Sequence, residues 1–575
     1  MERGIGTSRG IGIGHVLIVY NASAVVNRGT HYNAEEEKKR FFEARKTFIE
    51  QTEELLSELE KKLGESDKDA LVLKNQIYLA RDITTENEVV AAIDNSHICA
   101  EAAFDDVCNK LIQLFSSMDN PDMQQRVTDI QDMRERMIQI LQGTKAFDLT
   151  NLPDNTVIVA DEIKPSMTAS MDIAHVAGIV AEKGGDTAHA SILARALEIP
   201  AVLSVKGILQ KVKNGDSIII DGAYGEVFIN PTQRTFSIYE KKKKKYEEHI
   251  EELKTFINKS TETADGKKVM LAANIGGADE AAKAVKAGAE GVGLFRTEFL
   301  FLNKNALPTE EEQFEEYKKA AVLTKGMPIT IRTLDIGGDK DIPYMGLTKE
   351  TNPFLGYRAI RFCLDRVDIF TTQLRAILRA SAYGSIRIMI PMITSVNEVR
   401  QVKDMIKKIC SDLDHNGISY DKNIQTGVMI ETPAAAIMAD AIAQEVDFFS
   451  IGTNDLTQYT IAVDRCNENV AYLYSAFNPA VLRLIRRIIE CAHNAGIEAG
   501  MCGEAAANAL MAPILLSFGL DEFSVSTGKV LETRKTIADW SLKEAGLVTD
   551  KVMSMATEKE VTDYLSDYLS ERNKK

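Results

Sequence analysis

From residue 262 onward the chain alternates short apolar segments with helical segments, and this order constrains the fold most strongly. The apolar segments are near-continuous runs, as strands of a parallel sheet buried on both faces require. Eight strand–helix units over about 280 residues have the size and order of a TIM (β/α)8 barrel. The expected strands are Val269–Ala273, Gly291–Phe295, Ile329–Thr333, Ile386–Ile390, Gly427–Ile430, Phe448–Ile451, Ile497–Met501 and Glu522–Val525.

The first 230 residues combine strand signals with a long helical segment. Residues 34–146 nearly lack glycine and show helical periodicity, which predicts an inserted bundle of about four helices. On either side, residues 1–20 and 147–230 contain short strands and predict one discontinuous α/β domain. The expected strands are at 15–20, 156–160, 178–180, 217–221 and 226–229. The first has no neighbour in sequence, so we expect it to pair with much later strands.

Three further segments complete the predicted organisation. The glycine-rich stretch from Gly4 to Gly14 predicts a turn. Residues 231–260, which include the run Lys241–Lys245, predict a charged linker helix, and residues 261–575 form the predicted barrel domain. We expect hinges near 147 and at 255–262, where the domains join.

Composition excludes several classes of protein. A length of 575 residues predicts three or four domains, and 45% apolar with 26% charged residues is typical of a soluble globular protein. The net charge of −16 argues against nucleic acid and anionic membranes as partners. The sequence shows no secretory leader and no 18-residue apolar run, and its seven cysteines lack CxxC spacing. We therefore expect a cytoplasmic protein without membrane insertion.

The stretch Gly184–Arg195 carries the first chemical signal. An apolar strand at 176–180 precedes two glycines, and a helical pattern follows, so His189 is expected in the first turn of a helix. Free N–H groups and the positive end of the helix dipole favour an anion there. A phosphoryl group carried on the nucleophilic imidazole would be stabilised at this place, and Thr187 could orient the ring. The alternative is that His189 is a structural residue in a buried turn.

Polar residues follow successive strands of the predicted barrel, where barrel enzymes carry their active sites. Arginines match phosphate and carboxylate oxygens in bidentate fashion, and two carboxylates can hold Mg²⁺ when a phosphate and water complete its ligands. A cysteine beside them could carry a proton to or from carbon, although a lone buried cysteine is more often only apolar filling. The candidates are Arg296, Arg332, Glu431, Asn454, Asp455, Arg465 and Cys502.

Several motifs resemble one known family. The pattern Gly-Gly-x-Thr-x-His-x-x-Ile-x-Ala-Arg around His189 resembles the phosphohistidine signature of enzymes that use phosphoenolpyruvate (PEP). The dikinase and synthase members need a further ATP-grasp domain, for which the chain has no room. Five stretches look like Enzyme I of the sugar phosphotransferase system, namely 293–302, 307–314, 332–340, 352–361 and 500–504.

The resemblance implies a role for each candidate. His189 would be phosphorylated by PEP, and Cys502 would protonate the resulting enolate to give pyruvate. PEP would be held by Arg296, Arg332, Arg465, Asn454 and Asp455, and Mg²⁺ by Glu431 and Asp455. Family members pass the phosphoryl group to a histidine of the carrier HPr, which docks on the helical insert, and they form homodimers through the barrel. This is the first step of sugar uptake by the phosphotransferase system.

The sequence also departs from the family pattern at four places. They are Arg9, Asp186, Asn478 and the segment 505–508. None removes a role named above, but a carboxylate at Asp186 would repel an incoming phosphoryl group unless it is turned away or paired. A regulatory protein that senses PEP or docks a carrier without sustained turnover therefore remains an alternative. A free-standing lyase-type barrel would leave the first 230 residues unexplained.

Overall fold

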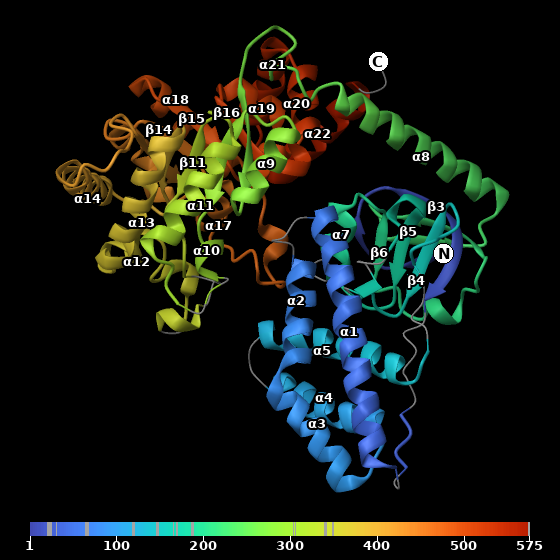
Figure 1. Ribbon diagram of the computed structural model, residues 1–575. Helices are drawn as coiled ribbons and strands as arrows, with labels where there is room; N and C mark the ends of the chain where they lie inside the picture. The colour runs from blue at the N-terminus through green and yellow to red at the C-terminus, as the bar shows by residue number, and fades with distance from the viewer. Residues whose placement is uncertain are drawn as a thin grey trace. The chain divides into compact units, whose positions relative to one another are not determined.

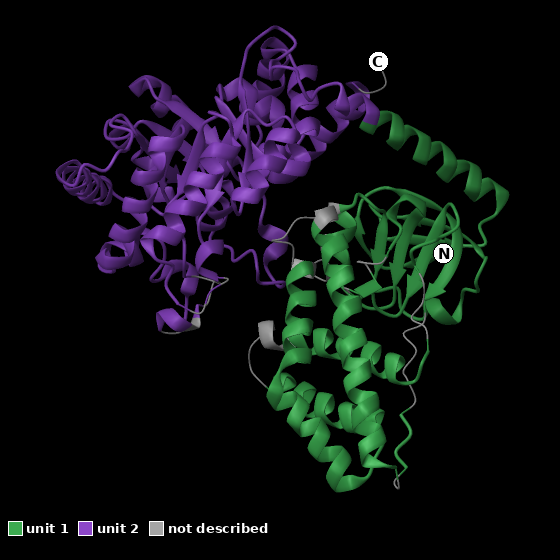
Figure 2. Ribbon diagram, viewed as in Figure 1, with its two compact units in different colours: residues 1–250 green, residues 251–575 purple. Residues whose placement is uncertain are grey.

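The computed structural model divides the chain into two compact units, Met1–Ile250 and Glu251–Lys575 (Figure 2). It describes residues 1–19, 26–29, 32–63, 68–117, 121–144, 149–164, 166–167, 171–185, 189–302, 304, 306–337, 342–347 and 350–572. Within these ranges, no helix has an apolar stretch long enough, and free enough of charge, to cross a bilayer.

Unit 1 contains an eight-stranded sheet with the order β1-β8-β7-β3-β4-β5-β6-β2. As predicted, the early strand β3 pairs with strands far along the chain, parallel to β4 and antiparallel to β7. A helix, α7 (His189–Ala196), follows β5. The strands are β1 (Glu2–Arg3), β2 (Ile5–Ser8), β3 (Ile11–Val19), β4 (Thr156–Ala160), β5 (Val176–Ala181), β6 (Ala201–Leu203), β7 (Ser217–Asp221) and β8 (Glu226–Ile229).

The predicted turn at Gly4–Gly14 is wrong over most of its length, because β2 and the start of β3 occupy this stretch. The chain bends between the two strands at Gly10, which has a φ of +125°, whereas Gly12 and Gly14 lie in β3 and allow close backbone approach. A Cβ atom on Gly14 would lie 1.8 Å from the carbonyl oxygen of Asn155, and one on Gly12 would lie 2.3 Å from that of Ala177. Sequence alone does not distinguish these two uses of glycine.

We therefore expect Gly14→Ala to destabilise unit 1 by about 1–3 kcal/mol or more, because backbone must move to admit the methyl group. The matched control is Gly546→Ala in α21 (Leu542–Met553), where nothing lies within 4 Å of an added Cβ. That change should be neutral or stabilising by up to about 1 kcal/mol. Scanning calorimetry measures both, and a Gly14→Ala protein that melts like the parent would contradict the packing argument.

The helical insert of unit 1 has five helices in the described ranges, one more than the approximate four predicted. They are α1 (Ala34–Leu63), α2 (Lys68–Arg81), α3 (Ile83–Ser96), α4 (Ala100–Ser116) and α5 (Pro121–Leu141). The additional break lies between α2 and α3, where the Asp82 carboxylate caps α3 by accepting a 2.8 Å hydrogen bond from the Thr85 N–H. An aspartate followed by threonines can cap a helix, and this signal was missed.

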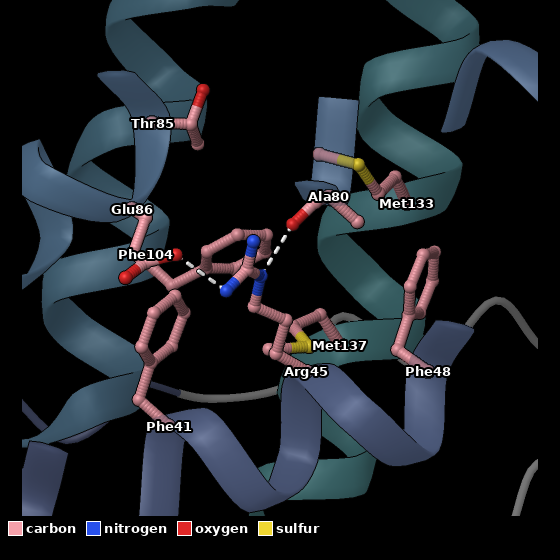
Figure 3. Close-up of a pocket in the computed structure, with 9 residues that line it drawn as sticks. All are labelled: Phe41, Arg45, Phe48, Ala80, Thr85, Glu86, Phe104, Met133 and Met137. Atoms are coloured by element: carbon pink, nitrogen blue, oxygen red, sulfur yellow. Dashed lines mark hydrogen bonds and ion pairs between the residues drawn. The ribbon is translucent and has the colours of Figure 1, made fainter. Parts of the chain in front are cut away.

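Arg45 of α1 holds this break in place (Figure 3). Its guanidinium donates to the carbonyl of Ala80, near the end of α2, and to the carboxylate of Glu86 in the first turn of α3, each at 2.5 Å. Apolar side chains of α1, α4 and α5 surround it, among them Phe41 and Met137. The arginine thus satisfies an otherwise free carbonyl at a helix end inside the bundle.

Unit 2 is a closed barrel of eight parallel strands in the order β10-β11-β12-β13-β14-β15-β16-β9, as predicted (Figure 1). Its large apolar core lies between the strands and the surrounding helices. The strands are β9 (Met270–Ile275), β10 (Gly291–Arg296), β11 (Ile329–Arg332), β12 (Ile386–Ile390), β13 (Gln425–Ile430), β14 (Phe448–Ile451), β15 (Glu498–Met501) and β16 (Glu522–Ser526).

Helices follow the strands around the barrel (Figure 1). They are α9 (Ala278–Lys286), α10 (Phe299–Leu302), α11 (Glu310–Leu323), α12 (Ile360–Asp365), α13 (Val367–Ala380), α14 (Val396–His415), α15 (Pro433–Ile437), α16 (Ala439–Ile442), α17 (Thr453–Ile461), α18 (Pro479–Ala495), α19 (Ala512–Phe518) and α20 (Val530–Asp539), then α21 and α22 (Glu558–Arg572).

The predicted linker helix is α8 (Gln233–Lys254), and the boundary between the units falls inside it. The segment after α8 is bound to the barrel by Arg534, whose side chain is fully buried. Its guanidinium donates to the carbonyl of Phe256 and to the hydroxyl of Thr261, both at 2.9 Å. The sequence predicts a hinge at 255–262. Bending of the chain there would have to break these hydrogen bonds.

Candidate active site

The carboxyl ends of the barrel strands bring the predicted residues to one end of unit 2. Arg296 and Arg332 are the last residues of β10 and β11, and Glu431 and Cys502 directly follow β13 and β15. Asn454 and Asp455 lie in the first turn of α17, after β14. In a parallel barrel all these strand ends open on the same face, which explains why strand order alone located them.

Arg332 is a buried cation held between two carboxylates. It donates to Glu298 at 2.6 Å and forms an ion pair with Asp335 at 3.0 Å. Burial lowers the pKa of Arg332, but Glu298, Asp335 and Glu431 raise it by more, so the guanidinium stays charged. Its Nε atom is buried and makes no hydrogen bond within the part of the chain that the structure describes. A buried donor without a partner points to a partner that these residues do not themselves supply.

Arg358 is a site residue that the sequence reasoning did not single out. Its guanidinium donates to Asp335 at 2.9 and 3.1 Å, and to Asp455 at 2.9 Å. It also donates to the hydroxyl of Tyr459 at 3.1 Å. Because Arg358 lies in the loop after β11 and not at a strand end, its place in the site depended on the course of that loop. The sequence signal that could have singled out Arg358 was its position inside the motif at 352–361.

We expect Arg358→Ala to destabilise unit 2 by about 3–5 kcal/mol, because it leaves two buried carboxylates without their shared cation. Asp335 and Asp455 are both less than a tenth exposed. Arg366→Ala is the control, since the Arg366–Asp368 pair is exposed and should contribute about 1 kcal/mol or less. Calorimetry of the two proteins tests this, and equal losses of stability would contradict the assigned role.

Glu431 is a buried carboxyl group among like charges. One oxygen accepts the Met392 N–H at 2.7 Å. Burial, together with the neighbouring Asp455 and Asp335, raises the pKa of Glu431 to about 8, against the lowering effect of Arg358 and Arg332. A divalent cation between Glu431 and Asp455 would relieve this repulsion. In many Mg²⁺ sites the protein supplies one or two carboxylates, and substrate phosphate and water supply the remaining ligands. Glu431 and Asp455 therefore fit Mg²⁺.

Asn454 and Arg465 border the same end of the barrel. The Asn454 side chain accepts the Glu504 N–H at 3.3 Å, and its carbonyl accepts the Tyr474 hydroxyl at 3.2 Å. Arg465 forms a 3.9 Å ion pair with Asp455. The Nη1 atom of Arg465 is buried and makes no hydrogen bond to other described residues. The same Nη1 atom forms the ion pair with Asp455, so it is a second donor that has a charged neighbour but no hydrogen bond.

The thiol of Cys502 is buried beneath these charged groups. The thiol contacts the Ile451 carbonyl at 3.9 Å, and Leu294, Met389, Met429 and Phe448 form the apolar layer around it. Burial raises the pKa of Cys502 to about 11, although Ser450 and Arg332 lower it in part. The group is therefore a protonated thiol at neutral pH, suited to donating a proton.

His189 is the first residue of α7, after the glycine turn that follows β5, as the sequence predicts. Its side chain, and the residues Asp186 and Thr187, lie outside what the structure describes. A role for the histidine thus depends on its place at a helix start.

The other departures have local explanations. Asn478 caps α18, because its side chain accepts the Ala480 N–H at 2.9 Å. Residues 504–507 form a short 3₁₀ turn, and the Asn508 side chain accepts the Leu510 N–H at 2.9 Å. Arg9 is exposed, between β2 and β3.

Comparison with known proteins identifies the family. Models of the PEP-utilising enzymes match along the chain: the N-terminal domain at residues 3–126, the mobile domain at 152–225 and the PEP-binding domain at 250–542. The phosphoenolpyruvate-protein phosphotransferase of Bacillus sp. (strain S) is 43% identical over 98% of this chain and 97% of its own length. Those of Priestia megaterium and Bacillus subtilis are each 41% identical, over 98% of this chain and 98% and 99% of theirs. The chain therefore belongs to the PEP-utilising enzymes, among the phosphoenolpyruvate-protein phosphotransferases.

Proposed function

We propose that this protein transfers the phosphoryl group of PEP to its own His189, releases pyruvate, and then passes the phosphoryl group to a histidine of the carrier HPr. It would act in the cytoplasm as the first enzyme of sugar uptake by the phosphotransferase system. One observation carries the proposal: a charged site at the strand ends where buried arginine donors stand beside two carboxylates.

The barrel end suits a small anion with both phosphate and carboxylate groups. The available donors are Nε of Arg332 and Nη1 of Arg465, and Arg296 lies at the neighbouring strand end. Arginine forks bind such oxygens with fixed geometry, and phosphoryl transfer requires mainly positioning and charge neutralisation. We propose that these three arginines, with Asn454 and Asp455, bind PEP.

Glu431 and Asp455 would hold Mg²⁺, which when bound neutralises charge on the transferred phosphoryl group. Cys502 supplies the proton for the other product. When the phosphoryl group leaves PEP, an enolate remains, and the thiol proton passes to its methylene carbon to form pyruvate. The apolar layer around Cys502 excludes water and keeps the thiol protonated until that step.

The helical insert offers a surface for HPr. Leu71, Tyr78, Ile83 and Leu114 are large apolar side chains about half exposed or more, on or next to α2, α3 and α4. The net charge of −16 favours a basic partner. Exposed apolar side chains can anchor a specific docking site, and we propose that HPr binds there.

The barrel also carries exposed apolar side chains, including Ile437, Met438, Tyr472 and Leu473. Such groups favour association, and we propose a homodimer formed through the barrel. Sedimentation of unit 2 at several concentrations would measure it, and a protein that stays monomeric at high concentration would contradict it.

Incubation with ³²P-labelled PEP and Mg²⁺, followed by mass spectrometry of the peptides, tests the proposal. Acid-labile phosphate on His189 that disappears when HPr is added would support both the activity and the carrier. Label that stays on His189 would contradict HPr as the acceptor. PEP binding without any label would instead favour a regulatory protein that senses PEP.

A further inference from the structure

A second polar layer lies inside the barrel, on the N-terminal side of Cys502. It surrounds a cavity of about 10 Å³, enough for one water molecule. The polar groups on its wall are Thr330, Arg387, Ser450, Glu498 and Glu522, and none of them is used by the reaction described above. The Ser450 hydroxyl is buried and has no hydrogen-bond partner among the described residues, so a water molecule in this cavity would supply one.

Two glycines make room for the carboxyl group of Glu522 in this layer. A Cβ atom on Gly293 would lie 2.3 Å from Oε1 of Glu522, and one on Gly500 would lie 3.4 Å from the same atom. Gly500 is also the partner of Ser450 in the ladder between β14 and β15. The carboxyl group of Glu522 therefore lies in the hollow next to the strand that carries Ser450.

Ser450 connects this layer to the thiol. Its side chain is 3% exposed, and its hydroxyl makes no directed hydrogen bond within the described residues. It lines the cavity. Phe448, two residues earlier in β14, lines the same cavity and packs with Cys502, so Ser450 lies on the face of the strand that meets the thiol. Its hydroxyl can accept one proton and donate another.

A proton that reaches Cys502 through Ser450 and the cavity would start from Glu522, and this carboxyl group is partly protonated near neutral pH. Burial raises its pKa to about 7, Arg387 lowers the pKa, and Glu498 and Asp521 raise it. Arg387 forms a 3.3 Å ion pair with Glu498, whose side chain is 64% exposed to solvent at the start of β15. A carboxyl group near half protonation at neutral pH both takes up and releases protons readily.

We propose that Ser450, one water molecule and Glu522 form a proton relay that restores the Cys502 thiol from the N-terminal end of the barrel. The inference rests on the proposed function. After Cys502 gives its proton to the enolate carbon, a thiolate remains. Ser450 donates its hydroxyl proton to the sulfur and accepts one from the water, which accepts one from the Glu522 carboxyl group. The Glu522 carboxylate then takes a proton from solvent, so each group returns to its starting form.

The test measures whether the proton on Cys502 exchanges with solvent. The enzyme is mixed with Mg²⁺, PEP and pyruvate that carries both ¹⁴C and a trideuterated methyl group. Transfer of ¹⁴C into PEP counts phosphoryl exchange cycles, in which the thiolate removes a deuteron from pyruvate. Deuterium that appears in solvent water, called deuterium loss below, counts the cycles in which that deuteron left Cys502 for solvent. We expect Glu522→Gln and Ser450→Ala to lower deuterium loss per exchange cycle at least tenfold, with exchange itself within a few-fold of the parent.

Glu498→Gln is the matched comparison, because it makes the same change in the same cavity wall. Since Glu498 raises the pKa of Glu522, this variant should keep the ratio of the parent at low pH, and the ratio should begin to decline at a lower pH. In the parent protein, deuterium loss should decline above pH about 7, as Glu522 loses its proton, and Glu522→Gln should remove this dependence. An unchanged ratio in Glu522→Gln, or an equal fall of both rates, would overturn the relay alone. No ¹⁴C exchange in the parent protein would overturn the proposed function as well.

Discussion

His189→Ala is expected to abolish phosphorylation of the protein by PEP while leaving PEP binding within about twofold of the parent. The phosphorylated residue and the PEP site lie in different units. His189 begins α7 in unit 1, and the charged residues proposed to bind PEP all lie in unit 2. No other side chain in the Gly184–Arg195 stretch is a nitrogen nucleophile at neutral pH. The measurement is phosphate incorporation from labelled PEP, together with calorimetric titration of PEP in the presence of Mg²⁺.

His175→Ala is the control for this variant. His175 is another histidine of unit 1, and it contacts the carboxylate of Asp172 at 2.7 Å. Its replacement should leave incorporation unchanged. Phosphate on the His189→Ala protein would assign the nucleophile to another residue. A folded His189→Ala protein that no longer binds PEP would contradict the separation of the two sites.

Cys502→Ala is expected to slow pyruvate release by about 10²- to 10⁴-fold, the usual contribution of a positioned proton donor. Alanine cannot donate a proton, so the enolate formed at the barrel end would return to PEP instead of becoming pyruvate. PEP binding should change little, because the thiol is buried beneath the charged groups and is 5% exposed. Stopped-flow detection of pyruvate and titration of PEP measure the two quantities.

Cys491→Ala provides the comparison for loss of a buried thiol. Cys491 lies in α18, is 8% exposed and packs in the main core of the barrel. It should lose some stability and keep the rate of pyruvate release. Equal rates in the Cys502→Ala and parent proteins would remove Cys502 from the reaction and, with it, the relay through Ser450.

The sequence predicted the barrel and the positions of most candidate site residues for one physical reason. A strand buried on both faces must be a continuous apolar run, so the strands of unit 2 are visible without any knowledge of their neighbours. Once the strands are known, parallel order places their carboxyl ends together. Arg296, Arg332, Glu431 and Cys502 follow from that rule alone.

Other features were decided only by contacts between residues far apart in the chain. Gly12 and Gly14 look like turn residues in sequence, but the carbonyls of Ala177 and Asn155 require them in a strand. Arg358 enters the site because a loop carries it to Asp455, 97 residues away.

The polar layer beneath Cys502 depends in the same way on Gly293 and Gly500, which leave space for a carboxyl group from a third strand. Local sequence specifies which segments form strands and helices, because their backbone hydrogen bonds and apolar periodicity are local properties. Tertiary structure decides which charges become buried together, and therefore which of them are paired, which stay protonated and which remain available to a ligand.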